Sequence, residues 1–219
     1  MKVLLFGATG MIGQGVLREC LLDPGITEVR TLVRTRSGVA HPKLKEILHQ
    51  DYFDYTGIED QLTELDACFF CLGVSSAGMT EEAYRRITHD LTLAAATALC
   101  RLNPAMTFSY ISGAGADSSE KGRIMWARVK GEIENALLRL PFKAVYLFRP
   151  GAIRPLHGIV SRTPLYRLLY RVLGPFLPLL KALSPDSLTT TEQLGRAMIH
   201  AARDGAPKAV LEMRDINRL

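Results

Sequence analysis

The fold of this chain is decided near its beginning by the stretch Val3-Leu-Leu-Phe-Gly-Ala-Thr-Gly-Met-Ile-Gly-Gln-Gly-Val-Leu17. The apolar run from Val3 to Phe6 is too short for a helix and ends at a glycine. It therefore predicts a strand buried on both faces of a parallel sheet, with a helix following at once. A strand, a glycine turn and a helix in this order are typical of a doubly wound α/β fold.

The glycines of the turn have the spacing Gly-x-x-Gly-x-x-Gly, and each has its own predicted role. Gly7 allows the sharp turn off the strand, Gly10 lets a pyrophosphate approach the backbone, and Gly13 lets the helix lie close to the strand. The free N–H groups at the helix start would face the phosphates. A glycine-rich turn without a ligand is the alternative. Cofactor contacts are predicted here for Gly7, Thr9, Gly10, Met11, Ile12 and Gly13.

The second predicted strand, Glu28 to Val33, is followed by Arg34-Thr-Arg36. A site that selects NAD has an acidic residue here for the ribose 2′-hydroxyl, whereas an NADP site has a guanidinium for the 2′-phosphate. The acidic residue is missing, and two arginines flank the position. This favours NADP, and NADPH over NADH, with Arg34 as the first candidate and Arg36 as the second. Two exposed loop arginines without a ligand are the alternative.

Further predicted strands bring more residues to the same edge of the sheet. Asp51-Tyr52-Phe53 follows a strand predicted over 46–50, where it would flank an adenine ring. A strand over 67–72 ends at Gly73. Strands over 107–111 and 144–148 end at Ser112 and at Arg149-Pro150-Gly151. Cofactor contacts are predicted on these segments for Asp51, Tyr52, Cys71, Leu72, Gly73, Pro150 and Gly151.

Helices are expected over 80–101, 124–140 and 190–203, and an edge strand over 209–212. With 219 residues the chain is long enough for one domain, residues 1–219, and too short for a second. Residues 152–188 carry several prolines among leucines and tyrosines, which predicts short helices that form a cap. Arg167 and Arg171 share a face of this cap, so docking on a membrane or partner is one interpretation and core packing is the other.

Charge and cysteine content narrow the class of protein. The net charge of +5 comes from cations scattered among acids, so no nucleic-acid partner is expected. The first strand leaves no room for a signal peptide and no uncharged apolar run is long enough to span a membrane, so we expect a cytoplasmic protein without membrane association. Cys68 and Cys71 are three apart on a predicted strand and face opposite ways, so no metal site is predicted.

Together these residues resemble the short-chain dehydrogenase/reductases, and within them the atypical, epimerase/dehydratase-like branch with its small Tat-interacting-protein-like members. The matching segments are Gly7-Ala-Thr-Gly-Met-Ile-Gly13, Cys71-Leu-Gly73, Ser112 with Gly115-Ala-Asp117, Val129-Lys-Gly-Glu132 and Phe148-Arg-Pro-Gly151. The resemblance implies a Rossmann-like, doubly wound parallel sheet, here with a small helical C-terminal cap, and an NADP site. It also implies homodimers through the helices over 80–101 and 124–140, which are common in the family.

The chemistry of that family uses a tyrosine as proton donor or acceptor, a lysine four residues later, and a serine that orients the substrate oxygen. Ser112 and Lys130 match the serine and the lysine, and they are the predicted catalytic residues. Trp126 stands in place of the usual tyrosine. An indole N–H donates a hydrogen bond but does not shuttle a proton near neutral pH.

Three interpretations follow from this departure. The favoured one is a redox-sensing or regulatory protein that binds NADP(H) without the family's chemistry. In the second, the protein is an NADPH-dependent oxidoreductase or epimerase for a small lipophilic carbonyl substrate, with Lys130 or a cap tyrosine, Tyr166 or Tyr170, as proton donor. In the third, the cap docks on a membrane or a protein and the cofactor is structural.

Overall fold

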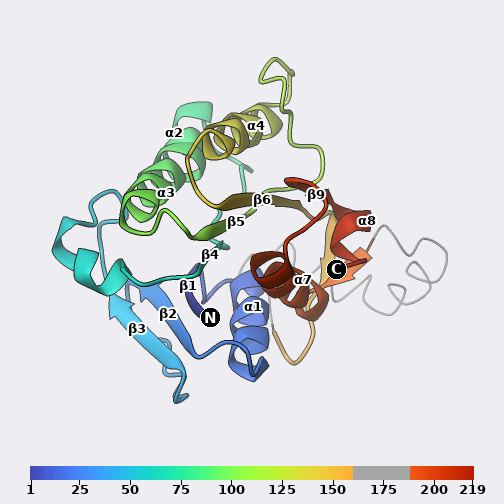
Figure 1. Ribbon diagram of the computed structural model, residues 1–219. Helices are drawn as coiled ribbons and strands as arrows, with labels where there is room; N and C mark the ends of the chain where they lie inside the picture. Colours follow the sequence, from blue (N-terminus) through green and yellow to red (C-terminus); the bar gives the residue numbers. More distant parts are fainter. Residues whose placement is uncertain (160–187) are drawn as a thin grey trace.

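In the computed structural model, which describes residues 1–159 and 188–219, seven parallel strands form one sheet in the order β3-β2-β1-β4-β5-β6-β9 (Figure 1). Every neighbouring pair in this sheet is parallel. The order reverses between β1 and β4, which is the pattern of a doubly wound sheet. The strands are β1 (Lys2–Phe6), β2 (Glu28–Val33), β3 (Leu44–Leu48), β4 (Ala67–Phe70), β5 (Thr107–Ile111), β6 (Ala144–Arg149) and β9 (Val210–Glu212).

Helices cover both faces of the sheet (Figure 1). One face carries α1 (Met11–Leu22) and α7 (Thr191–Asp204), and the other carries α2 (Glu81–Arg85), α3 (Leu91–Leu102) and α4 (Met125–Leu138). Two short helices, η1 (Thr56–Leu62) and α8 (Met213–Ile216), complete the layers. The predicted doubly wound α/β fold is therefore confirmed.

Alternate strand residues supply the two halves of the core. Val3 and Leu5 of β1 pack toward α1 and α7, whereas Leu4 and Phe6 pack toward α3 and α4. Because neighbouring residues of a strand face opposite ways, a strand with both sides covered is apolar throughout, as the first stretch of the sequence indicated. Cys68 of β4 belongs to the α3 side and Cys71 packs against the α1 side.

Several elements differ in bounds or geometry from the sequence prediction. Strand β3 runs over Leu44–Leu48 instead of 46–50, because it is an edge strand in which only Ile47 is buried, so its sequence pattern is weak. Strand β4 ends at Phe70. The helix expected over 80–101 contains a π-helical turn, η2 (Arg86–Asp90), between α2 and α3. Such a turn adds a residue to the helical repeat and is frequent at functional sites.

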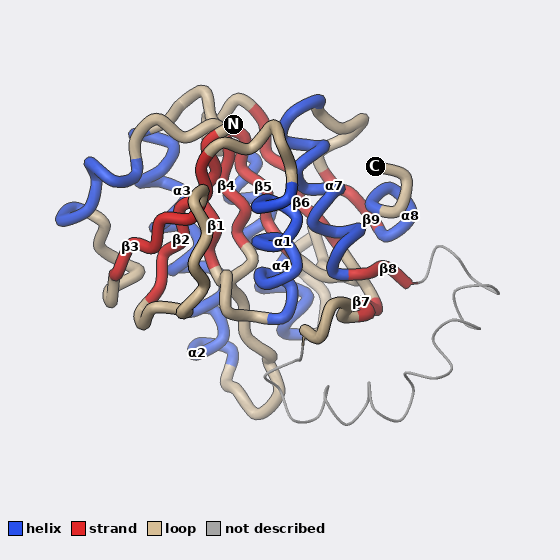
Figure 2. The backbone as a smooth tube through the Cα atoms, turned by 90° about the horizontal axis from the view of Figure 1, so that it is seen from below, coloured by secondary structure: helices blue, strands red, loops and turns tan. Residues whose placement is uncertain are grey.

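The segment predicted as a helical cap begins and ends in strand. Two short parallel strands, β7 (Ala152–Arg154) and β8 (Leu188–Thr190), pair with each other (Figure 2). Thr190 then caps α7, because its hydroxyl accepts the Gln193 N–H at 3.0 Å. The cap residues singled out from the sequence, Tyr166, Arg167, Tyr170 and Arg171, lie outside the described residues. Within the described ranges, no helix has the length and hydrophobicity needed to cross a membrane.

Candidate cofactor-binding site

The glycine turn joins β1 to α1 at the carboxyl edge of the sheet. Gly7 has φ +75°, and a Cβ atom there would lie 2.7 Å from the backbone of Cys71. A Cβ atom at Gly13 would lie 2.0 Å from the carbonyl oxygen of Gly7. At Gly10 the nearest such atom, the same oxygen, would be 3.3 Å away. Gly7 and Gly13 are therefore required by the fold itself, whereas Gly10 leaves space beside the backbone.

The N-terminus of α1 is suited to an anion. Gly10 is the N-cap residue, it provides no side-chain cap, and the first turn of the helix holds no acidic residue. The Gln14 N–H is bonded to the Gly10 carbonyl at 2.8 Å, so the N–H groups of Met11, Ile12 and Gly13 precede the first such bond of the helix. With the positive end of the helix dipole, these donors form a site for phosphate.

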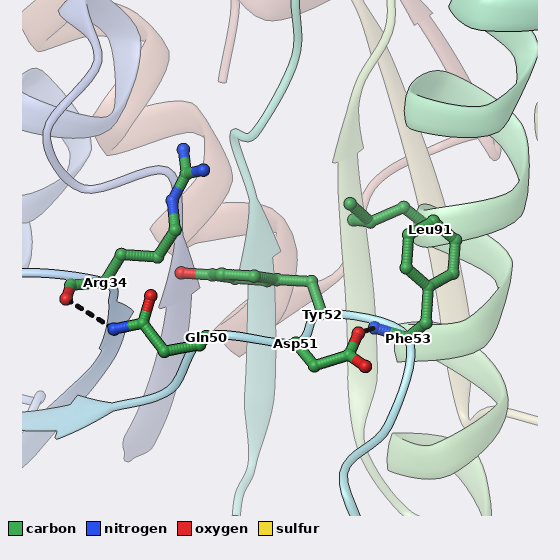
Figure 3. A pocket seen from close by; sticks show the side chains of 6 residues that line it. All are labelled: Arg34, Gln50, Asp51, Tyr52, Phe53 and Leu91. Atoms are coloured by element: carbon green, nitrogen blue, oxygen red, sulfur yellow. Dashed lines mark hydrogen bonds between the residues drawn. The ribbon is translucent and has the colours of Figure 1, made fainter.

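A pocket of about 380 Å³ opens where β2 and β3 end (Figure 3). Tyr52 is its buried floor, with the hydroxyl donating to the Leu32 carbonyl at 3.1 Å. In Figure 3 the Tyr52 ring lies between the Arg34 side chain and the side chains of Phe53 and Leu91. The lining residues are Arg34, Gln50, Asp51, Tyr52, Phe53 and Leu91.

Sequence reasoning placed Asp51, Tyr52 and Phe53 here but missed Gln50 and Leu91. Gln50 donates to the Arg34 carbonyl at 2.8 Å, which joins the two strand ends. Asp51 accepts the Phe53 N–H at 2.9 Å and so shapes the loop. Leu91 is the first residue of α3, where apolar spacing along the helix indicates only a core residue. No local pattern identifies a helix residue that reaches across to a pocket between other elements.

Arg34 and Arg36 are both exposed, and among the described residues neither guanidinium makes a hydrogen bond or an ion pair. The nearby Glu46 carboxylate accepts the Ser37 N–H at 2.9 Å and holds the loop. The pocket therefore has unpaired positive charge at the end of β2, the position where a dinucleotide fold discriminates between a ribose hydroxyl and a phosphate.

Two further segments meet the glycine turn at this edge. The Cys71 N–H donates to the Phe6 carbonyl at 3.1 Å, which carries the pairing of β1 and β4 past the end of the strands. Leu72 follows, and Gly73 has no atom within 4 Å of the place a Cβ atom would occupy. Open space beside Gly73 is what a ligand passing over the end of β4 requires.

Ser112 follows β5 and its backbone N–H donates to the Phe148 carbonyl at 2.7 Å. Its side-chain oxygen is buried and makes no hydrogen bond to any described residue. Buried hydroxyl groups usually have a partner, so the unpaired Ser112 hydroxyl is a candidate contact for a ligand oxygen. Trp126, in the first turn of α4, lies on the loop after Ser112, since a Cβ atom at Gly115 would be 3.6 Å from its ring.

Pro150 and Gly151 follow β6 beside this loop. The Pro150 carbonyl accepts the Ala114 N–H at 2.9 Å, so the ends of β5 and β6 stay joined beyond the strands. Gly151 is exposed. The predicted residues thus gather along the carboxyl ends of six adjacent strands, and their contacts with a cofactor remain predictions.

Lys130 of α4 is buried, with its ammonium donating to the Tyr110 hydroxyl at 2.8 Å and to the Ile111 carbonyl at 3.1 Å. Burial lowers its pKa from the ordinary 10.5 to about 8, and the carboxylate of Glu134 opposes this change. An ammonium has three donors. Two are used by β5, which leaves one for a ligand at the strand end.

The lowered pKa of Lys130 makes a pH-dependent contribution to stability. Below pH 8 the lysine is protonated in both the folded and unfolded states, and the cost of burying its charge is fully present. Between about pH 8 and 10.5 the unfolded chain binds the extra proton, so stability rises with pH. Relative to Lys130→Met, the wild-type free energy of unfolding is expected to rise by roughly 1.4 kcal/mol per pH unit in this window. Urea titrations of both proteins from pH 7 to 10 measure it, and a constant difference would contradict it.

Known proteins with similar sequences include a fungal protein and a mammalian protein. The protein fmp52 of Emericella nidulans, named mitochondrial, is 32% identical over 159 residues, which are 69% of this chain and 66% of that protein. HTATIP2 of Rattus norvegicus is 27% identical over 155 residues, 69% of this chain and 62% of that protein. The chain thus matches just under two thirds of the length of each. No protein-family model matches the chain.

Solved structures show the same fold at low sequence identity. The enzyme WbmH of Bordetella bronchiseptica, in complex with NAD⁺, has a TM-score of 0.67 at 16% identity over 96% of this chain and 74% of its own. A UDP-N-acetylglucosamine 4-epimerase of Methanobrevibacter ruminantium has a TM-score of 0.69 at 15% identity over 95% of this chain and 74% of its own.

The cytoplasmic location predicted from the sequence is contradicted by these relatives. The FMP52 proteins of Emericella nidulans, Aspergillus terreus, Neosartorya fischeri and Candida albicans are all named mitochondrial. The prediction rested on a missing secretory signal and a missing membrane span. Neither feature distinguishes the cytosol from the interior of an organelle.

Proposed function

The chain belongs to the atypical short-chain dehydrogenase/reductase family with a Rossmann-type fold, and from this premise we propose that it binds NADP(H) in preference to NAD(H). The observation that carries the proposal is the unpaired guanidinium of Arg34, which lines the pocket where β2 ends, with the exposed Arg36 two residues further along the chain. A 2′-phosphate would neutralise this charge and accept paired hydrogen bonds, which a hydroxyl does not.

The residues at the carboxyl edge fit such a cofactor. The uncapped start of α1 and the space at Gly10 suit the pyrophosphate, and the open space at Gly73 suits the central riboses. Asp51 and Tyr52 line the adenine pocket, and the third donor of Lys130 is free for a ribose hydroxyl. When bound, the nicotinamide would supply a hydride donor or acceptor near Ser112.

We favour a redox-sensing or regulatory role over turnover. Trp126 occupies the place of the family's tyrosine, and its ring packs on the loop after Ser112. An indole does not exchange a proton with a substrate oxygen near neutral pH. Binding of the cofactor requires only groups that are present, whereas turnover requires a proton donor at that place.

One observation favours the enzymatic alternative, a reductase or epimerase for a lipophilic carbonyl compound. The Ser112 hydroxyl is buried without a partner, as expected for a group that binds a substrate oxygen. Lys130, with a pKa of about 8, would then be the proton donor. Oxidation of NADPH in the presence of lipophilic aldehydes or ketones would establish this alternative.

The cofactor proposal predicts a reversal of selectivity in Arg34→Glu. Trp126 is the only tryptophan, so quenching of its fluorescence by reduced nicotinamide reports binding. We expect wild type to bind NADPH at least tenfold more tightly than NADH, since hydrogen bonds to charged groups contribute about 1.5–3 kcal/mol. In Arg34→Glu, NADPH affinity is expected to fall at least tenfold while NADH affinity is retained or improved.

The matched control is Arg139→Glu, which makes the same charge change at the C-cap of α4. Parallel strands and an antiparallel helix place this residue at the opposite edge of the sheet from the pocket. Its NADPH affinity is expected to match wild type. If Arg34→Glu and Arg139→Glu weaken NADPH equally, the selectivity does not reside in Arg34. If wild type shows no saturable quenching by either nucleotide, the cofactor proposal fails.

A further inference from the structure

Tyr110 lies in the middle of the core and has no part in the binding scheme above. It is on β5, two residues before Ser112, and therefore on the same face of the strand. Its ring is 6.0 Å from that of Phe70 on β4, and only 1% of the residue is exposed. A phenol so deep in the protein does not contact a substrate, so its hydroxyl needs another explanation.

That explanation lies in its contact with Lys130. The Nζ atom of Lys130 is 2.8 Å from the Tyr110 hydroxyl oxygen and 4.6 Å from the ring centroid. The lysine thus reaches from α4 across the top of the Tyr110 ring to the end of β5, where the Ile111 carbonyl accepts its second hydrogen bond. The strand holds the amino group at the edge where the proposed cofactor would lie.

We propose that Tyr110 is a positioning residue that holds the amino group of Lys130 at the end of β5 and supports it in both of its protonation states. The consequence for cofactor binding rests on the proposed function above. In the family that this chain belongs to, the tyrosine beside the lysine precedes it by one helical turn, a place that Trp126 takes here. In this chain a phenol meets the same lysine from the strand below.

A hydroxyl group suits this task better than a carbonyl. It accepts a hydrogen bond from the ammonium, and when the proton is lost it donates one to the lone pair of the amine. Burial raises the pKa of Tyr110 well above its ordinary value, so the proton exchanged is that of the lysine. The buried amino group therefore never loses its partner on the strand.

Other polar groups around the pair leave this assignment intact. Glu134, one turn along α4, favours the charged lysine, but its carboxylate is itself paired with Arg149 of β6. Tyr84 of α2 faces Tyr110 and is also buried with a raised pKa, so it carries no charge near pH 8. The hydrogen-bond acceptors of Lys130 are those on β5.

The direct test is an NMR titration of lysine ¹³Cε resonances in the cofactor-free protein, with Lys130→Met identifying the signal. In wild type the midpoint is expected near pH 8. In Tyr110→Phe it is expected about one pH unit lower, since hydrogen bonds to an ammonium are stronger than those to an amine. The matched control is Tyr55→Phe, because Tyr55 is also buried but its hydroxyl has no partner among the described residues. An unchanged midpoint in Tyr110→Phe would overturn the proposal.

NADPH binding gives a second readout. Wild-type affinity is expected to fall as pH rises through about 8, when Lys130 loses the charge that attracts the phosphates. In Tyr110→Phe this fall should occur at lower pH, so that affinity at pH 7.5 is about threefold weaker than in wild type and Tyr55→Phe. Equal affinities and pH profiles in all three would overturn the link to the cofactor. If wild type binds no NADPH, the cofactor proposal fails, while the NMR titration still decides the role of Tyr110.

Discussion

Replacement of Gly13 by alanine is expected to destabilise the protein by about 3 kcal/mol or more and to abolish NADPH binding. The added Cβ atom would lie 2.0 Å from the Gly7 carbonyl oxygen and 2.6 Å from the Gly7 carbonyl carbon. Both are backbone atoms of the turn, which cannot rotate away as a side chain would. Helix α1 must therefore move off β1, and the phosphate site at its start moves with it. Urea denaturation and tryptophan quenching measure the two effects.

Gly10→Ala separates stability from binding in the same turn. Its Cβ atom would meet only the Gly7 carbonyl oxygen, at 3.3 Å, so the fold should lose about 1 kcal/mol or less. The methyl group would nevertheless occupy space that the proposed pyrophosphate needs, and NADPH affinity should fall more than tenfold. Gly57→Ala, with no atom within 4 Å, is the control and should change neither quantity. Normal NADPH binding by Gly10→Ala would contradict the placement of the phosphates.

The strands of the sheet interior could be predicted from sequence because they leave a local signal. The apolar runs around Leu4 and Phe69 end at glycine or near it, and both faces of each strand are buried. Strand β5 was predicted with its observed bounds, Thr107–Ile111. The glycine turn was also predictable. The role of each glycine depends only on one strand and on the helix that directly follows it.

Features that depend on distant segments could not be predicted. The contact between Lys130 and Tyr110 joins a helix to a strand, and nothing in either segment indicates the other. Leu91 lines the pocket because of where the helix after η2 packs on the sheet, which no local pattern gives. The strands β7 and β8 are three residues long and pair across a gap of more than thirty residues, too short for any periodicity to appear.

The largest side-chain effect is expected for Glu134→Ala, at about 3–5 kcal/mol of lost stability. Glu134 of α4 is 1% exposed, and its carboxylate binds the Arg149 guanidinium through both oxygens, with Nε to Oε1 at 3.0 Å. Arg149 also reaches Glu212 at 3.1 Å and the Ser118 hydroxyl at 2.6 Å. Removal of Glu134 leaves a mostly buried cation whose remaining carboxylate partner is about half exposed.

Glu212→Ala is the matched control, since it removes the other carboxylate of the same guanidinium. Glu212 is 47% exposed, so its ion pair is screened by solvent and should contribute about 1 kcal/mol or less. The double variant Glu134→Leu/Arg149→Met should be more stable than Glu134→Ala, because it removes the buried charge together with its partner. Urea denaturation at pH 7 compares the three. Equal losses of stability from Glu134→Ala and Glu212→Ala would mean that the Glu134–Arg149 pair does not hold α4 against β6. The pair would then not hold Lys130, one turn away on α4, in its place either.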